Sequence, residues 1–291
     1  LSKRQKTHEE EKEMIIIDNN QIILASIFAT IRDGEVNDDI IRHMVLNTYR
    51  MYRNKFKNKY GELVIANDSK DCWRRDTFPY YKASRRKKQQ KESKFDWAVV
   101  FDSMNTIRQE VEEIFPFKSI TVDKAEADDI IGVLAKQYHM QENIIIISND
   151  KDFQQLQRYP NVKQYSPLKK SFLECKDPER FLVDHIIKGD VSDGIPNILS
   201  DDDVFVREEK RQTPCGVKKI EKIREELQKW SEERNYDRNN RMINLNMVPS
   251  HIEEEVLSQF IKTKKTDANK VLSYFIEKRL RGLMENIQEF V

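Results

Sequence analysis

Three short runs of aliphatic residues, each followed within three residues by an aspartate, constrain the fold of this chain most. The runs are 15–17, 63–66 and 144–147, and the acids that follow them are Asp18, Asp68 and Asp150. Such runs are typical of strands that are buried on both faces. Helical periodicity separates them, over about 38–58, 103–115 and 126–138. This alternation predicts an α/β fold with a mostly parallel central sheet that helices cover on both faces.

The rest of the chain completes this prediction. Further strands are expected near 117–121 and 162–165, the latter with a hairpin partner near Phe172. From residue 181 onward the pattern is mainly helical, and Pro249 and Ser250 open a late helix. We therefore expect a mobile tail at 1–13, an α/β core at 14–180 and a helical C-terminal region at 181–291 that does not fold as a separate domain.

The composition excludes several classes of protein. With 38% apolar and 35% charged residues and only 7 Gly, the chain is globular rather than disordered. Cys72, Cys175 and Cys215 are too few and too widely spaced for a disulfide framework or a zinc site, which indicates a reducing compartment. No apolar run approaches the roughly 20 residues that span a bilayer, and the N-terminus lacks the apolar core of a signal peptide. We expect a cytoplasmic protein without a membrane partner.

Acidic side chains gather where the predicted strands end. In an open parallel sheet the carboxyl ends of the strands border one crevice, so Asp18, Asp68 and Asp150 are expected to converge there. Further acids lie at a helix start and in later loops: Glu126, Asp128, Asp129, Asp152, Asp190 and Asp193. A single acid at the end of a strand is more often a turn former or a helix cap. The recurrence of such an acid at the ends of three strands favours a functional site.

So many carboxylates cannot share a pocket as bare anions, because like charges a few ångströms apart raise each other's pKa. Oxygen ligands without Cys or His favour magnesium or manganese over zinc. Two such ions, about 3.5–4 Å apart, can hold the attacking and leaving oxygens of a phosphodiester displacement. The pattern therefore predicts metal-assisted phosphodiester hydrolysis. By contrast, the acidic triplet 201–203 is interpreted as a solvated loop.

A basic and aromatic segment follows Asp68. Residues 70–94 contain ten Lys or Arg against three acids, although the net charge of the whole chain is only +1. Trp73, Phe78, Tyr80 and Tyr81 are interleaved with these cations. Basic groups neutralise phosphates and aromatic faces stack on unpaired bases, so the segment is a candidate nucleic-acid contact. The alternative is a solvated amphipathic helix whose aromatic side chains pack inward.

Together these stretches resemble the 5′ nuclease or flap-endonuclease family, and within it the enzymes of T-even-type phages. The matching stretches follow in order: IIIDNNQ at 15–21, VIANDSKDCWRRDTFPYYKASR at 64–85, DKAEADDIIGVLAKQ at 123–137, IIIISNDKDFQQL at 144–156, YPNVKQYSP at 159–167 and IIKGDVSDGIP at 186–196. The resemblance covers roughly residues 14–200 and continues more weakly to the C-terminus. Each motif is modest alone, whereas their ordered combination is specific.

The resemblance implies a PIN-like fold and a site with two Mg²⁺ ions, for which Mn²⁺ can substitute. Asp18, Asp68, Asp128 and Asp150 would surround the first ion, whereas Asp152, Asp190 and Asp193 would serve the second, largely through water. Glu126 and Asp129 would be acids close to the metals. Lys82 would stabilise the phosphate in the transition state, with water as the nucleophile. The residues implied in nucleic-acid binding are Arg74, Arg75, Tyr81, Lys82, Arg85, Arg86, Lys87, Lys218 and Lys219, and Tyr81 would stack on a frayed base.

One segment departs from the family pattern. Relatives usually follow the Gly-Asp-x-x-Asp motif with a short Gly-rich turn that joins two helices and grips duplex DNA. Here residues 197–214 intervene before Gly216, and the T-even-type enzymes are also extended at this point. The helix-hairpin element for DNA binding is therefore altered. Lys218 and Lys219 are the candidates for phosphate contacts that remain, together with Lys222.

The function that the resemblance implies is removal of RNA primers and adjacent DNA from 5′ ends during replication, by 5′→3′ exonuclease and flap cleavage. The implied partners are DNA and RNA–DNA hybrids with a free 5′ end, a single-strand-binding protein and a sliding clamp. A monomer in the cytoplasm, of the host cell if a phage encodes the chain, is expected. Two alternatives remain: a PIN-type ribonuclease, and a catalytically silent protein that binds DNA structures.

Overall fold

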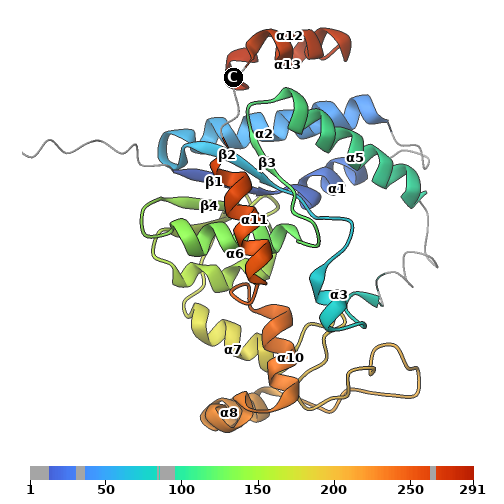
Figure 1. Ribbon diagram of the computed structural model, residues 1–291, viewed down its shortest axis with the longest axis vertical. Helices are drawn as coiled ribbons and strands as arrows, with labels where there is room; N and C mark the ends of the chain where they lie inside the picture. The colour runs from blue at the N-terminus through green and yellow to red at the C-terminus, as the bar shows by residue number, and fades with distance from the viewer. Residues whose placement is uncertain (1–12, 31–36, 84, 86–95, 263–266) are drawn as a thin grey trace, which may run out of the picture.

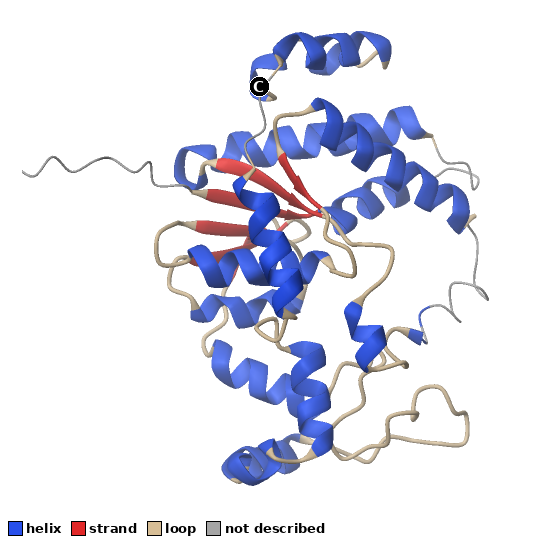
Figure 2. Ribbon diagram, viewed as in Figure 1, coloured by secondary structure: helices blue, strands red, loops and turns tan. Residues whose placement is uncertain are grey.

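In the residues that the computed structural model describes, 13–30, 37–83, 85, 96–262 and 267–291, six strands form one sheet (Figures 1 and 2). The strands are β1 (Met14–Asp18), β2 (Glu62–Ala66), β3 (Lys118–Ile120), β4 (Ile144–Ile147), β5 (Val162–Ser166) and β6 (Ser171–Leu173). Their order is β3-β2-β1-β4-β5-β6, and every pair is parallel except β5 with β6. The predicted mostly parallel sheet and the hairpin partner at Phe172 are confirmed.

Helices cover both faces of this sheet (Figure 2). They are α1 (Asn19–Thr30), α2 (Asp38–Tyr60), α3 (Trp73–Thr77), α5 (Trp97–Ile114), α6 (Ala127–Tyr138), α7 (Pro178–Lys188), α8 (Val217–Glu225), α9 (Leu227–Ser231), α10 (Arg234–Ile243), α11 (Ser250–Ile261), α12 (Ala268–Glu277) and α13 (Arg281–Met284), with short 3₁₀ helices η1 (Lys151–Arg158) and η2 (Ile287–Glu289). Among the described residues, no helix is both long and apolar enough to cross a membrane.

Successive side chains of each strand point to opposite faces, and this alternation divides the core into two clusters. Ile15 and Ile17 belong to a cluster with residues of α1, α2, α5 and α12, whereas Ile16 belongs to a cluster with residues of α6, α7, α10 and α11. All four isoleucines of β4 are fully buried. One cluster thus includes residues from β1 through α11, so the sheet and the helices that follow residue 181 share a core.

Two helices begin where the sequence pattern did not place them. Helix α5 starts at Trp97 rather than near residue 103, because the side chain of Asp96 caps it by accepting hydrogen bonds from the backbone N–H groups of Ala98 and Val99. Helix α1 was not predicted at all. It follows β1 directly, and its mainly apolar sequence shows almost no amphipathic pattern. The late helix at Ser250 is confirmed.

Strand β3 lies at one edge of the sheet, and α11 covers that edge. The Gln259 side chain accepts a hydrogen bond from the backbone N–H of Thr121 (3.3 Å) and donates one to its carbonyl oxygen (3.0 Å). The Lys118 ammonium donates to the carbonyl oxygen of Phe260 at 2.6 Å. The Gln259 side chain therefore occupies part of the hydrogen-bonding capacity that a further strand would use.

Acidic side chains of the long connection between α7 and α8 form ion pairs that hold it against the rest of the structure. Asp202 pairs with Arg234 and Arg238 of α10, and Asp203 pairs with Lys210 at 2.6 Å. This corrects the interpretation of 201–203 as a merely solvated triplet. All three acids have cationic partners, because the insert folds back on α10 and on itself. Asp201 pairs with Lys210 at 2.9 Å but is largely exposed.

Candidate functional site

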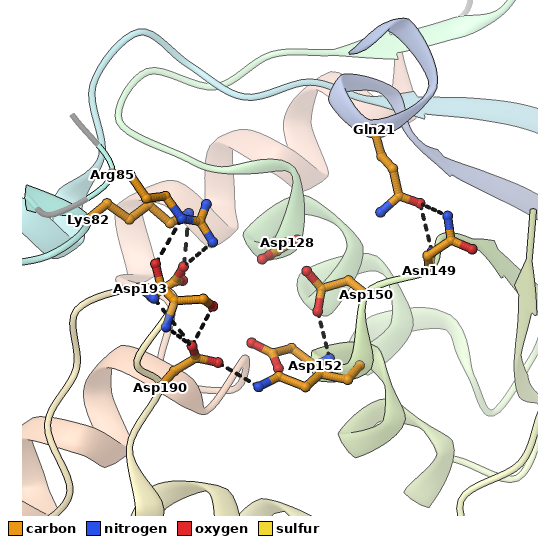
Figure 3. A pocket seen from close by; sticks show the side chains of 11 residues that line it. Gln21, Lys82, Arg85, Asp128, Asn149, Asp150, Asp152, Asp190 and Asp193 are labelled. Carbon is orange, nitrogen blue, oxygen red and sulfur yellow. Dashed lines mark hydrogen bonds and ion pairs between the residues drawn. The ribbon is translucent and has the colours of Figure 1, made fainter. Parts of the chain in front are cut away.

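A pocket of about 420 Å³ opens beyond the carboxyl end of β4 (Figure 3). Five aspartates line it: Asp128, Asp150, Asp152, Asp190 and Asp193. Asp128 comes from the first turn of α6, Asp150 and Asp152 from the start of η1, and the other two from the loop after α7. Three segments that are far apart in the sequence therefore contribute acids to one pocket, as the motif pattern predicts.

Two more acids lie behind this lining, at the ends of the neighbouring strands. Asp18 is the last residue of β1, and its carboxylate accepts a hydrogen bond from the Ser148 hydroxyl at 3.1 Å. Asp68 follows β2 and accepts a hydrogen bond from the backbone N–H of Ala127 at 2.7 Å, next to Asp128. Because β1 pairs in parallel with both β2 and β4, the carboxyl ends of these strands lie side by side at the same end of the sheet.

The acids of this cluster repel one another. Burial, followed by the charge of Asp68, raises the pKa of Asp18 to about 7. Burial, with Asp150 and then Asp18, raises the pKa of Asp128 well above its ordinary value. Burial and the charges of Asp150 and Asp190 also raise the pKa of Asp152 to about 7, despite the nearby His185. A divalent cation in the pocket would stabilise the charged forms of these groups and reverse the shifts.

The raised pKa values predict that metal-free protein loses stability as the pH rises. Asp18 and Asp152 bind protons more tightly folded than unfolded, so unfolding releases protons between the ordinary carboxyl pKa and about 7. We therefore expect the melting temperature in EDTA to fall from pH 5 to pH 8. Saturating Mg²⁺ should flatten the profile. Thermal denaturation at constant ionic strength measures this, and a flat profile in EDTA would contradict the described electrostatics.

Asp190 differs from the other acids because several hydrogen-bond donors surround its carboxylate. It accepts hydrogen bonds from the backbone N–H and the hydroxyl of Ser192 (2.8 and 2.5 Å), from Nε2 of His185 (3.1 Å) and from Lys151 (2.9 Å). Burial alone would raise its pKa, but the donors, His185 foremost, lower it. Asp190 is therefore charged throughout the physiological range. Neither His185 nor Lys151 was predicted from the sequence.

Cationic side chains form the opposite wall of the pocket (Figure 3). The Lys82 ammonium lies 2.7 Å from Glu126 and 3.7 Å from Asp193, and the Arg85 guanidinium lies 2.6 Å from Asp193. Lys82 has a left-handed backbone, with φ of 54°, and its N–H donates to the carbonyl oxygen of Asp193 at 2.7 Å. Burial would lower the pKa of Lys82, but Asp193 and Glu126 raise it, so the ammonium stays charged.

The structure corrects the expected exposure of Arg74 and Tyr81. Arg74 is 2% exposed and pairs with Glu126 at 3.1 Å and with Asp129 at 2.7 Å. Tyr81 is 3% exposed, and its hydroxyl donates to Glu126 at 2.9 Å. Neither side chain can meet a nucleic acid in this conformation, because both are packed against α6.

The same contacts correct the expected place of Asp129 near the metals and specify the partners of Glu126. Asp129 is fully buried, and both of its oxygens face Arg74, so it belongs to the contact between α3 and α6 rather than to the pocket. Burial would raise the pKa of Glu126, but Lys82 and Arg74 lower it to about 2. Glu126 therefore acts as a fixed anion that holds the Lys82 ammonium at the pocket wall.

The remaining predicted cations are on the surface or outside the described residues. Lys218 and Lys219 are exposed on α8, and Arg75 is half-buried beside Asp71. Arg86 and Lys87 lie outside the described residues. One contact that the sequence did not reveal is made by Arg108 of α5, whose guanidinium donates to the carbonyl oxygen of Asp68 at 3.1 Å.

Strand-end carboxylates that face a basic wall on a mostly parallel sheet are the arrangement that the resemblance to 5′ nucleases implies. Comparison with known families agrees with this class. Residues 13–184 match the model of the 5′-3′ exonuclease, N-terminal resolvase-like domain, and residues 177–290 match that of the T4 RNase H C-terminal region. The chain belongs to the 5′-3′ exonuclease family, so the predicted family is confirmed.

Individual relatives agree with this assignment. The chain is 34% identical to ribonuclease H of Enterobacteria phage T4 over 97% of each chain. It is 28% identical to a 5′-3′ exonuclease of Buchnera aphidicola, over 65% of this chain and 66% of the relative. A bacteriophage T5 flap endonuclease, solved with DNA and metal ions, has a similar fold, with a TM-score of 0.61 at 14% identity over 85% of this chain and 97% of that one. The predicted similarity to the T-even-type enzymes is also confirmed.

Proposed function

We propose that this protein is a Mg²⁺-dependent 5′ nuclease that hydrolyses phosphodiester bonds near the free 5′ ends of DNA and RNA–DNA strands. The observation that favours this function most is the pocket itself, in which strand-end and loop aspartates face Lys82 and Arg85. Relatives named as a ribonuclease H, a 5′-3′ exonuclease and a flap endonuclease support the same reaction. Removal of RNA primers during replication, in the cytoplasm of a host cell, is the proposed biological role.

The residues of the pocket fit hard divalent cations. The five lining acids offer carboxylate oxygens, which Mg²⁺ and Mn²⁺ prefer. Burial, and after it the charges of neighbouring aspartates, raises the pKa values of Asp18 and Asp128, and a bound cation would offset both effects. One oxygen of Asp152 is buried without a hydrogen-bond partner. Bound cations would supply the Lewis acidity that activates water and stabilises the charge on the phosphate.

We assign the acids to two cation positions, following the order of the family motifs. Asp18, Asp68, Asp128 and Asp150 would hold one cation at the strand ends. Asp152, Asp190 and Asp193 would hold a second one at the loop after α7, largely through water. In Figure 3 Asp128 and Asp150 lie near each other, and Asp152 lies toward Asp190, which is consistent with two cation positions. Mn²⁺ is expected to substitute for Mg²⁺ because both accept oxygen ligands.

Lys82 is the residue of the basic wall that we assign to catalysis. Its ammonium lines the pocket and is held by Glu126, so it is already oriented before a phosphate enters. A positive charge fixed in this way stabilises the charge that develops on the phosphate in the transition state. Arg85, which is half-exposed beside Asp193, would contact the backbone of the strand.

Replacement of Lys82 by Met is expected to slow cleavage by about 10²–10³-fold, the usual effect of removing one oriented charge from a transition state. Single-turnover cleavage at saturating enzyme measures this loss, and the affinity for substrate should change much less. Lys124→Met is a matched control, because Lys124 also has a left-handed backbone and an acidic partner, Asp76, but lies outside the pocket. Equal effects of the two substitutions would contradict the role of Lys82.

Binding of the duplex is assigned to the exposed lysines of α8. Lys218 and Lys219 lie in the first turn of this helix. Contacts from Arg75, Arg86 and Lys87 to the 5′ strand also remain predictions of the family resemblance. The same holds for the single-strand-binding protein, the sliding clamp and the monomeric state.

The proposed function is tested with 5′-labelled flap and nicked-duplex substrates whose 5′ segments are RNA or DNA. Short labelled products that form with Mg²⁺ and disappear with EDTA are the expected result. A circular single-stranded RNA of the same sequence should stay intact, because it has no 5′ end. Cleavage of the circle would favour a PIN-type ribonuclease. Tight binding to flaps without cleavage would leave a catalytically silent DNA-binding protein.

A further inference from the structure

His185 lies on α7 directly behind the pocket and is only 7% exposed. Its two ring nitrogens face two different acids of the pocket. Nε2 is 3.1 Å from a carboxylate oxygen of Asp190, and Nδ1 is 3.5 Å from Oδ1 of Asp152. Oxygen or nitrogen atoms of the three side chains lie within 4.8 Å of one another. An imidazole is thus built into the set of acids that the proposed function assigns to the second cation.

The surroundings of Asp190 determine which ring nitrogen of His185 is available to bind a cation. Asp190 is fixed by hydrogen bonds from Ser192 and by the Lys151 ammonium, so it is a firm acceptor for Nε2–H of His185. A neutral imidazole that donates through Nε2 has its lone pair on Nδ1. A carboxylate that holds one ring nitrogen while the other binds a cation is a recurrent arrangement around metal ligands.

Nδ1 lies near an atom that also lacks a hydrogen-bond partner. Nδ1 of His185 and Oδ1 of Asp152 are both buried, and neither has a hydrogen-bond partner. Buried polar atoms of this kind are uncommon, since each unsatisfied one costs about 1–3 kcal/mol. At 3.5 Å from each other, the two atoms are close enough for both to serve as ligands of one cation.

We propose that His185 is a direct ligand of the cation held by Asp152, and that this makes the position selective for first-row transition cations over Mg²⁺. An imidazole nitrogen binds Mn²⁺, Co²⁺ or Zn²⁺ more readily than Mg²⁺, which accepts oxygen ligands almost exclusively. The inference rests on the proposed metal-dependent function. It adds a preference for transition cations over Mg²⁺, which carboxylates alone do not provide. The rival arrangement is a charged imidazolium that bridges Asp152 and Asp190 and ligates no cation.

Manganese itself is the probe that separates these two arrangements. Manganese chloride is added to the full chain, and electron spin-echo modulation is recorded from the bound Mn²⁺. A directly bound imidazole gives a ¹⁴N modulation, which changes to that of ¹⁵N when only the histidines carry ¹⁵N. We expect this change in the parent protein. Its absence from bound Mn²⁺ would overturn the inference, and no variant is needed for this result.

A pair of histidine variants identifies the residue. His185→Gln should abolish the nitrogen modulation and weaken Mn²⁺ at this position by at least about tenfold relative to Mg²⁺, measured by competition. His139→Gln is the matched control, because His139 is a partly buried histidine that stacks on Tyr159 at the far end of α6. It should leave both readouts unchanged. Modulation that persists in His185→Gln would overturn the assignment.

Failure of this inference can be distinguished from failure of the proposed function. If Mg²⁺-dependent cleavage occurs and Mn²⁺ binds without a nitrogen ligand, the nuclease function stands and only the role of His185 is wrong. If no divalent cation binds and no substrate is cleaved, both proposals fail together. Circular dichroism of each variant confirms that the fold is retained before its metal binding is interpreted.

Discussion

Asp128→Asn is expected to abolish cleavage, by about 10³-fold or more, and at the same time to stabilise the metal-free protein. The loss follows because Asp128 lines the pocket in the first turn of α6, between the strand-end acids and the basic wall. An amide keeps the shape of the side chain but removes a charge that a catalytic cation needs. Cleavage of a 5′-labelled flap in Mg²⁺ measures the loss.

The gain in stability follows from the repulsion within the cluster. Burial, Asp150 and Asp18 raise the pKa of Asp128, and a carboxyl group with a raised pKa destabilises the folded state above its ordinary pKa. Asparagine removes this cost, so the melting temperature in EDTA at pH 7.5 should rise. Asp123→Asn, at an exposed position outside the pocket, is the control that should change neither activity nor stability. Retained cleavage in Asp128→Asn would contradict the proposed site.

Arg74→Met should destabilise the protein by about 3–5 kcal/mol, the usual cost of removing one partner from a buried ion pair. The Arg74 guanidinium pairs with Glu126 and Asp129 and also donates to the carbonyl oxygen of Met242 at 2.9 Å. Without it, Asp129 would be a fully buried carboxylate with no cationic partner among the described residues. Denaturant-induced unfolding at pH 7 measures the change in free energy.

The neighbouring residue provides a matched control for this prediction. Arg75→Met removes a partly exposed guanidinium that lies 3.5 Å from Asp71, so it should cost less than about 1 kcal/mol. If Arg74 instead contacts nucleic acid, as its place in the basic segment first indicated, Arg74→Met would weaken substrate binding and leave stability unchanged. That result would show that the buried pairing with α6 does not persist in solution.

The parts of the site that follow from strand periodicity were predictable. Asp18, Asp68 and Asp150 come after buried aliphatic runs, and parallel pairing of β1 with β2 and β4 brings these strand ends together. The alternation of runs and helices similarly predicts the sheet. Charge counting was less informative about residues 70–94, because a sum of charges does not reveal which cation has a buried acidic partner. The Arg74 guanidinium and the Tyr81 hydroxyl both contact Glu126 at the start of α6, and only the tertiary structure shows these contacts.

His185 was missed for a related reason. It lies among apolar residues on a helix, five positions before Asp190, where a histidine is most simply interpreted as part of the core. Its relation to Asp152 depends on the packing of α7 against η1, and no sequence spacing encodes that contact. Helix α1 was hidden in the same way, because its mainly apolar sequence shows no polar face.

The edge of the sheet at β3, which α11 covers, limits where the chain can be truncated. Gln259 and Lys118 link the α/β part of the sequence to α11, which lies far along the chain. A fragment that ended near residue 180 would keep every strand but would expose the edge at Thr121, as well as the apolar face that α11 buries. Exposed edges recruit strands from other molecules, so such a fragment would tend to self-associate. The C-terminal helices are thus expected to protect the core from self-association.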